Sequence, residues 1–159
     1  MEEIDQVREA EEANYRNARG VLGESVSLVQ ELVDLYKLFG EMIKQSGVGS
    51  DDEIVAASTF LLACQYQLAV GALALVRGHL TDSFSYARKA IELCAFAARV
   101  KRHPHLAMVW LSAGRDDASY EKYREKFSGD KLFPKDHTIL EKLRKAYDHC
   151  SKLRSVCHP

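Results

Sequence analysis

The segment 147–159, YDHCSKLRSVCHP, concentrates side chains that could do chemistry, because His149-Cys150 is mirrored by Cys157-His158. On a helix, Cys150 and Cys157 would share a face but stand about 10.5 Å apart along the axis. Two thiolates on one zinc ion need sulfurs within about 4 Å of each other, since each Zn–S bond is roughly 2.3 Å long. The two histidines would point to nearly opposite sides. The spacing therefore does not predict a metal site, and we expect no metal and no cofactor.

A second chemical possibility is the pair Arg144 and His149, separated by KAYD. An arginine could neutralise the negative charge that develops on a phosphodiester during its cleavage. A histidine could move the proton of an RNA 2′-hydroxyl or of the leaving oxygen. On a regular helix the two residues would lie about 140° apart. Their convergence would therefore need a distorted backbone or a contribution from a partner chain.

Arg88 and Glu92 form a third candidate group, with Arg77 in the preceding turn. These side chains could line a polar pocket for a small molecule. The alternative is an i, i+4 ion pair within one helix, which contributes about 0.3–0.5 kcal/mol. The spacing favours the ion pair and leaves the pocket open as an interpretation.

Composition places the chain in an ordinary class. It has 159 residues, 47% of them hydrophobic and 28% charged, with a formal net charge of -1. We expect one compact domain over 1–159, with no overall attraction to nucleic acid or anionic membranes. Cys64 and Cys94 lie in apolar runs typical of small buried residues. The acidic N-terminus does not look like a signal peptide, so we expect a cytoplasmic location and no disulfide framework.

Helical periodicity runs through almost the whole sequence. The expected helix starts include a capping box in which Ser50 and Glu53 satisfy each other's backbone N–H groups. These patterns predict an all-α fold: a four-helix bundle, up-and-down, with additional short helices. A peripheral N-terminal helix would occupy 1–20 and the bundle 22–157. The long helices are expected at 22–45, 51–78, 82–101 and 137–157, with short ones from Pro104 and at 117–127.

Residues 54–76 carry no charge and are long enough to cross a bilayer. Gln65 and Gln67 lie in the middle of the segment, and alanine supplies much of the rest. A helix that is apolar all round can also be buried inside a protein. We therefore expect no membrane insertion, and either a surrounded core helix or a homodimer interface.

The order of these segments resembles the HEPN superfamily, through RGHLTDSFSYARKAIELCAFAARV, HPHLAMVWL and AYDHCSKLRSVCHP. The likeness covers about Ile54 to the end and extends to uncharacterised bacterial helical proteins. HEPN proteins are helical bundles found among toxins and phage-defence ribonucleases, and they act as dimers. Their Arg-x4–6-His motif would fall on Arg144 and His149, with Lys145 in the polar position after the arginine. Relatives of this kind run on past His-Pro, so the resemblance also implies further residues after Pro159.

Three functions follow as expectations. The first is a non-catalytic helical interaction or regulatory module, which the resemblance would place in phage defence or a toxin system, acting as a homodimer. The alternative is a HEPN-like, metal-independent ribonuclease that acts on RNA with Arg144 and His149. The third is a small-molecule pocket near Arg88 and Glu92.

Overall fold

The computed structural model describes residues 2–46, 51–128, 131–133 and 138–156, and the regular elements in these ranges are helices. The predicted all-α class is therefore confirmed. The helices are α1 (Glu2–Val21), α2 (Gly23–Ser46), α3 (Asp52–Val76), α4 (Leu80–Arg102), α5 (Leu106–Leu111), α6 (Asp117–Phe127) and α7 (Thr138–Val156).

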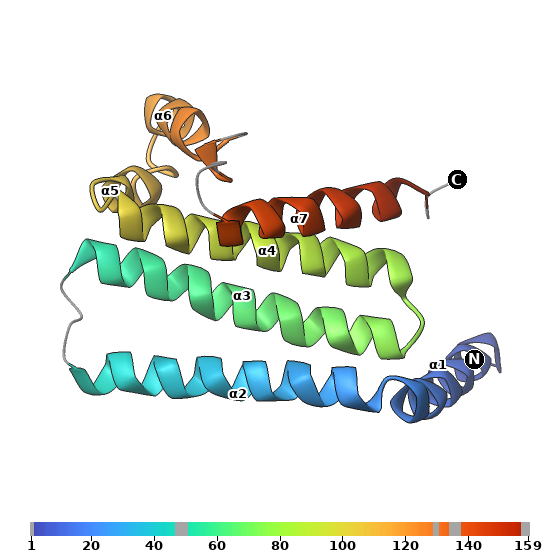
Figure 1. Ribbon diagram of the computed structural model, residues 1–159. Helices are drawn as coiled ribbons and strands as arrows, with labels where there is room; N and C mark the ends of the chain where they lie inside the picture. Colours follow the sequence, from blue (N-terminus) through green and yellow to red (C-terminus); the bar gives the residue numbers. More distant parts are fainter. Residues whose placement is uncertain (1, 47–50, 129–130, 134–137, 157–159) are drawn as a thin grey trace.

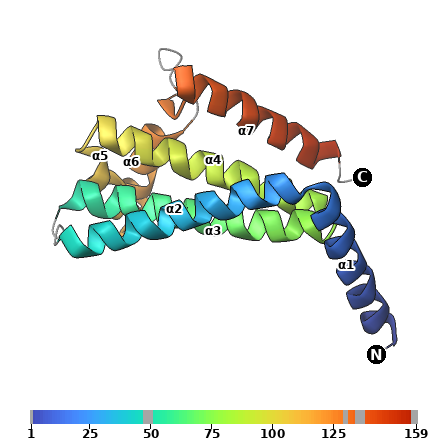
Figure 2. The same ribbon diagram turned by 60° about the horizontal axis from the view of Figure 1, so that its bottom comes forward.

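The long helices α2, α3, α4 and α7 follow one another in space as they do in the sequence (Figure 1). The α3–α4 contact is the most extensive, α7 packs on α4, and α2 packs on α3. Helix α1 meets the N-terminal end of α2 and points away from the other helices (Figure 2). It is held there by Asn14, whose Nδ2 donates to the backbone oxygen of Arg77 at 3.2 Å. Glu11 also pairs with His79 at 2.9 Å, so α1 is tied to the turn between α3 and α4.

Helices α3 and α4 approach each other closely because small residues face the contact. A Cβ atom added at Gly71 would lie 3.0 Å from the Cβ of Tyr86 on α4. The turn between the two helices contains Gly78 with φ of 89°, a backbone conformation that residues with a side chain rarely adopt. The sequence thus supplies glycine where two helices must touch and where the chain must reverse.

Helix α3 begins one residue later than its sequence suggested. Asp51 is the N-cap, and its side chain accepts a hydrogen bond from the backbone N–H of Glu53 at 2.9 Å. The Ser50 half of the expected capping box lies outside the described residues. Asp116 caps α6 in the same way, through the N–H of Ser119 at 2.7 Å. Each cap satisfies a backbone donor that the first helical turn leaves without a partner.

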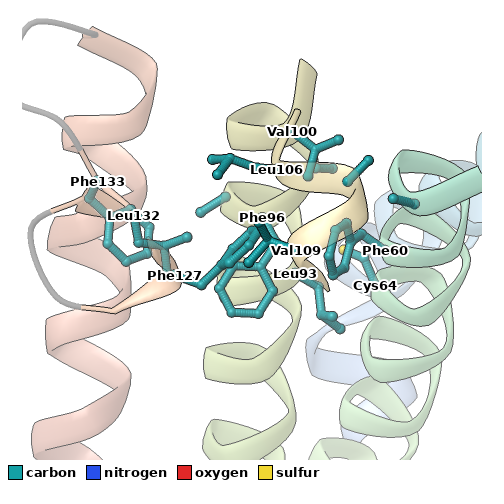
Figure 3. Packing of buried hydrophobic residues seen from close by; sticks show 14 of the residues in the cluster. Phe60, Cys64, Leu93, Phe96, Val100, Leu106, Val109, Phe127, Leu132 and Phe133 are labelled. Atoms are coloured by element: carbon teal, nitrogen blue, oxygen red, sulfur yellow. The ribbon is translucent and has the colours of Figure 1, made fainter. Parts of the chain in front are cut away.

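The hydrophobic core lies between α3, α4 and α5 and extends toward α7 (Figure 3). Phe60 of α3 contacts Phe96 of α4 and Trp110 of α5, with ring centroids 5.4 and 4.5 Å apart. Phe96 also meets Phe127 at the end of α6, edge to face. These contacts fix α5 and α6 against the end of the α3–α4 pair.

Helix α3 lies between α2 and α4 but is not surrounded on every side. Leu62, Tyr66 and Leu73 remain 47%, 64% and 48% exposed. Among the described helices, α3 is the one that is long and apolar enough to cross a membrane. A helix in the core of a protein can pass the same test of length and composition. Its apolar surface is shared between the core and an exposed stripe.

Candidate binding pocket

An open pocket of about 420 Å³ lies between α4, α6 and α7. Figure 3 shows Phe127 and Leu132 between α4 and α7, where they form part of its wall. Its aromatic and charged side chains come from three helices and from the segment 131–133. The lining residues are Glu92, Phe96, Tyr123, Arg124, Phe127, Ser128, Leu132, Phe133, Arg144, Tyr147 and Asp148.

Tyr147 joins α7 to α4 at the edge of this pocket. Its hydroxyl oxygen accepts a hydrogen bond of 2.7 Å from Nη2 of Arg88. The guanidinium of Arg88 also lies 4.9 Å from the centre of the Tyr147 ring, within the range of a cation–π contact. Arg88 Nε is buried without a hydrogen-bond partner. Arg88 therefore holds Tyr147 in place and does not itself line the pocket.

Glu92 supplies negative charge to the pocket. Its carboxylate pairs with Lys89 at 2.9 Å. The sequence favoured an i, i+4 ion pair between Arg88 and Glu92, but in the structure Arg88 contacts Tyr147 and Glu92 contacts Lys89. Burial raises the pKa of the nearby Tyr123 hydroxyl, and the charge of Glu92 raises it further. The Tyr123 hydroxyl, which lines the pocket, can donate a hydrogen bond to a bound molecule.

Arg144 and His149 do not come together within one chain. Arg144 is partly buried and lines the pocket, whereas His149 is exposed and is not among the lining residues. Helix α7 runs from Thr138 to Val156, so the two side chains are about 140° apart around its axis. Tyr147 and Asp148 follow Arg144 by three and four residues, which places them on its side of the helix. Arg144 therefore shares the pocket side of α7 with these two residues, and His149 does not.

Arg77 does not belong to the pocket. It is exposed at the C-cap of α3, beside α1. Of the three residues expected to form a polar pocket, Glu92 lines it, Arg88 supports it through Tyr147, and Arg77 lies elsewhere. The sequence could not separate these roles, because they depend on where α7 packs.

Arg99 positions the connection between α6 and α7. Its Nε donates to the backbone oxygen of Lys126 at 2.8 Å, and its Nη1 to that of Lys131 at 2.6 Å. These bonds hold the chain beside Phe127 and Leu132, which form the apolar wall. The sequence contains no signal for this role, because the accepting carbonyls lie 27 and 32 residues away in the chain.

The charges around the pocket are balanced. Arg124 and Arg144 face it from α6 and α7, and Glu92 and Asp148 from α4 and α7. Five aromatic rings complete the wall: Phe96, Tyr123, Phe127, Phe133 and Tyr147. Within the described part of the chain, no group of three or more His, Cys, Asp or Glu side chains could hold a metal ion. The arrangement can bind a ring together with one positive and one negative group.

Comparison with known protein families, with curated proteins and with solved structures found no match. The geometry of the pocket and the surface of the helices are therefore the grounds on which a function is proposed.

Proposed function

We propose that this protein is a non-catalytic regulatory module that binds a small aromatic zwitterion in the pocket between α4, α6 and α7. The observation that carries the proposal is the meeting of Glu92, Arg144 and Asp148 beside an aromatic wall. The volume of about 420 Å³ falls within the range of small-molecule sites, roughly 300–1,000 Å³.

The class of ligand follows from the lining residues. The aromatic side chains favour a planar ring, which would stack or meet them edge to face. A carboxylate on the ligand would accept hydrogen bonds from Arg144 or Arg124, and an ammonium group would donate to Glu92 or Asp148. A phosphate chain is less suited, because two carboxylates oppose the two arginines.

Calorimetric titration with L-phenylalanine, 3-phenylpropionate and phenethylamine tests this proposal, because the last two each carry only one of its charges. We expect measurable binding of the zwitterion and weaker binding of both analogues. Arg144→Gln should raise its Kd about 10- to 100-fold, since a hydrogen bond to a charged group contributes about 1.5–3 kcal/mol. Lys142→Gln, an equal loss of charge at an exposed site on the same helix, should leave Kd unchanged.

The proposal fails if none of the three compounds binds or if all three bind equally. It also fails if the Lys142→Gln and Arg144→Gln proteins cannot be distinguished, because binding would then not depend on the lining arginine.

We further propose that the partner is a second copy of this chain, which packs on α2. Leu28, Leu32, Leu35, Phe39 and Met42 recur at alternating intervals of four and three residues, as in a coiled-coil seam. They are between 38% and 65% exposed. Their stripe borders an open, largely apolar groove of about 560 Å³ between α2, α3 and α4, to which Phe39 also contributes.

A two-fold axis along this stripe would pack α2 of one copy against α2 of the other, which is the self-complementary arrangement that a symmetric dimer requires. Within one chain, α2 packs on α3 and α7 on α4. In the dimer, the helices of the second copy would cover the side of α2 that faces away from α3. Sedimentation equilibrium should show a dimer for the parent and a monomer for Leu35→Glu. Ser27→Glu adds the same charge to α2 outside the stripe and should remain dimeric.

The HEPN-like ribonuclease is an alternative proposal, and it needs a second subunit. Since Arg144 and His149 diverge on α7, a composite site would have to take one of them from each chain. Incubating the parent, Arg144→Ala and His149→Ala with structured and single-stranded RNA in EDTA tests this proposal. Cleavage by the parent and by neither variant would establish a nuclease, whereas the regulatory proposal predicts no cleavage that depends on these residues.

A further inference from the structure

A second group of reactive side chains lies away from the pocket, between α2, α3 and α4. The Sγ atoms of Cys64 on α3 and Cys94 on α4 are 3.2 Å apart. The hydroxyl of Tyr36 on α2 lies 3.5 Å from Cys64 Sγ and 3.6 Å from Cys94 Sγ. Both cysteines are free thiols. The sequence predicts only that both are small buried residues, and it does not predict their pairing, because they are 30 residues apart in the chain.

The two thiols differ in access. Cys64 is 1% exposed and belongs to the hydrophobic core. Cys94 is partly buried and lines the open groove between α2, α3 and α4, together with Leu61, Ala98 and Phe39. A small molecule that enters the groove therefore meets Cys94 first, and Cys64 lies directly behind it.

The surroundings favour a thiolate at Cys94. Once Cys94 is ionised, its sulfur can only accept, so the S–H of Cys64 donates to it across the 3.2 Å contact. This bond and the Tyr36 hydroxyl lower the pKa of the Cys94 thiol to about 6 despite its burial. The same bond raises the pKa of Cys64, which keeps its proton. The charged groups at the end of the groove are Glu53 and Lys101, which pair with each other at 3.7 Å.

We propose that Cys94 and Cys64 form a reversible disulfide when a hydroperoxide enters the groove. The Cys94 thiolate attacks the outer oxygen of ROOH and breaks the O–O bond, and with a proton from solvent the products are a Cys94 sulfenic acid and ROH. The Cys64 sulfur then attacks the Cys94 sulfur, the S–O bond of the sulfenic acid breaks, and the proton of Cys64 leaves with the hydroxyl group as water. Overall, two thiols and ROOH give one disulfide, ROH and water, so the cysteines lose two electrons and the peroxide gains them.

The movement that this reaction needs is small. A disulfide has an S–S distance of about 2.05 Å, whereas the two sulfurs now lie 3.2 Å apart. The bond would link α3 to α4 at the base of the groove. It would also remove the thiol that faces the groove.

Hydrogen peroxide treatment in a Cys157→Ser background, followed by denaturing alkylation and peptide mass spectrometry, tests the proposal. We expect a Cys64–Cys94 cross-linked peptide that disappears on reduction, while Cys150 is alkylated in full. Burial raises the pKa of the Cys150 thiol, which makes it an internal control for slow reaction. In Cys64→Ser, which lacks the second thiol, dimedone should trap a sulfenic acid on Cys94. Oxidation of Cys150 before Cys94, or no Cys64–Cys94 peptide, would overturn the proposal.

The pH dependence of the oxidation rate should also identify the attacking thiol. We expect the rate constant for oxidation of Cys94 by peroxide to rise with pH and to reach half its plateau near pH 6, because the thiolate is the nucleophile. Tyr36→Phe removes one donor to this thiolate, so the half-maximal pH should move upward. A half-maximal pH of about 8.5, as for an ordinary cysteine, would show that the contact with Cys64 does not activate Cys94.

Discussion

At the scale of single residues, the hydroxyl of Tyr147 provides a hydrogen bond that joins α7 to α4. Tyr147→Phe keeps the ring but removes the acceptor of the 2.7 Å bond from Arg88. Arg88 Nε is already buried without a hydrogen-bond partner. Losing the bond from Nη2 as well would leave a second donor of the guanidinium unsatisfied, which is costly in a buried position. We expect the free energy of unfolding to fall by about 1–3 kcal/mol, measured by urea denaturation. Tyr66→Phe, at a tyrosine that is 64% exposed, should change it little, and an equal loss in both variants would contradict this reading.

Some of the residues that line the pocket can be predicted from the sequence, and others cannot. Arg144 and Glu92 were singled out from the sequence, but for two separate sites, Arg144 with His149 and Glu92 with Arg88. Tyr147 and Asp148 could also have been found, because they follow Arg144 at helical spacing on α7. Arg124 and Phe133 could not, since they reach the pocket only through the packing of α6 and of the segment after it.

At the scale of elements, two glycines offer a matched comparison. In Gly71→Ala the new Cβ would lie 3.0 Å from the Cβ of Tyr86, so α4 must move away by a few tenths of an ångström. In Gly40→Ala it would lie 3.5 Å from the end of the Leu62 side chain, an ordinary contact. We expect Gly71→Ala to destabilise the fold by about 1–3 kcal/mol. Gly40→Ala should stabilise it by up to about 1 kcal/mol, the gain in helix propensity. Thermal unfolding distinguishes the two, and a stabilised Gly71→Ala protein would contradict the close α3–α4 contact.

The helices themselves were predicted closely from periodicity and breakers. The expected 117–127 helix is α6, and the expected 22–45 helix differs from α2 by one residue at each end. Hydrophobic spacing determines which residues form a helix and which face is apolar. It does not determine which helices become neighbours, and for that reason Arg77 was grouped with a pocket that lies elsewhere.

At the scale of the whole molecule, the exposed stripe of α2 predicts that stability depends on association. If folded chains pair through Leu35 and its neighbours, higher protein concentration should raise Tm, because the dimer is formed only by folded chains. We expect this dependence in the parent and in Ser27→Glu but not in Leu35→Glu, measured by calorimetry over a range of concentrations. A Tm of the parent that is independent of concentration would argue against the dimer.

The proposed binding of a small zwitterion beside Arg144 can be followed by amide chemical-shift mapping during an L-phenylalanine titration. We predict saturable shifts at Glu92, Tyr123 and Tyr147, with the amides of the α2 stripe unchanged. These shifts should be lost in Arg144→Gln and kept in Lys142→Gln. Shifts confined to the groove between α2 and α4, or no shifts at millimolar ligand, would contradict the assignment of the pocket.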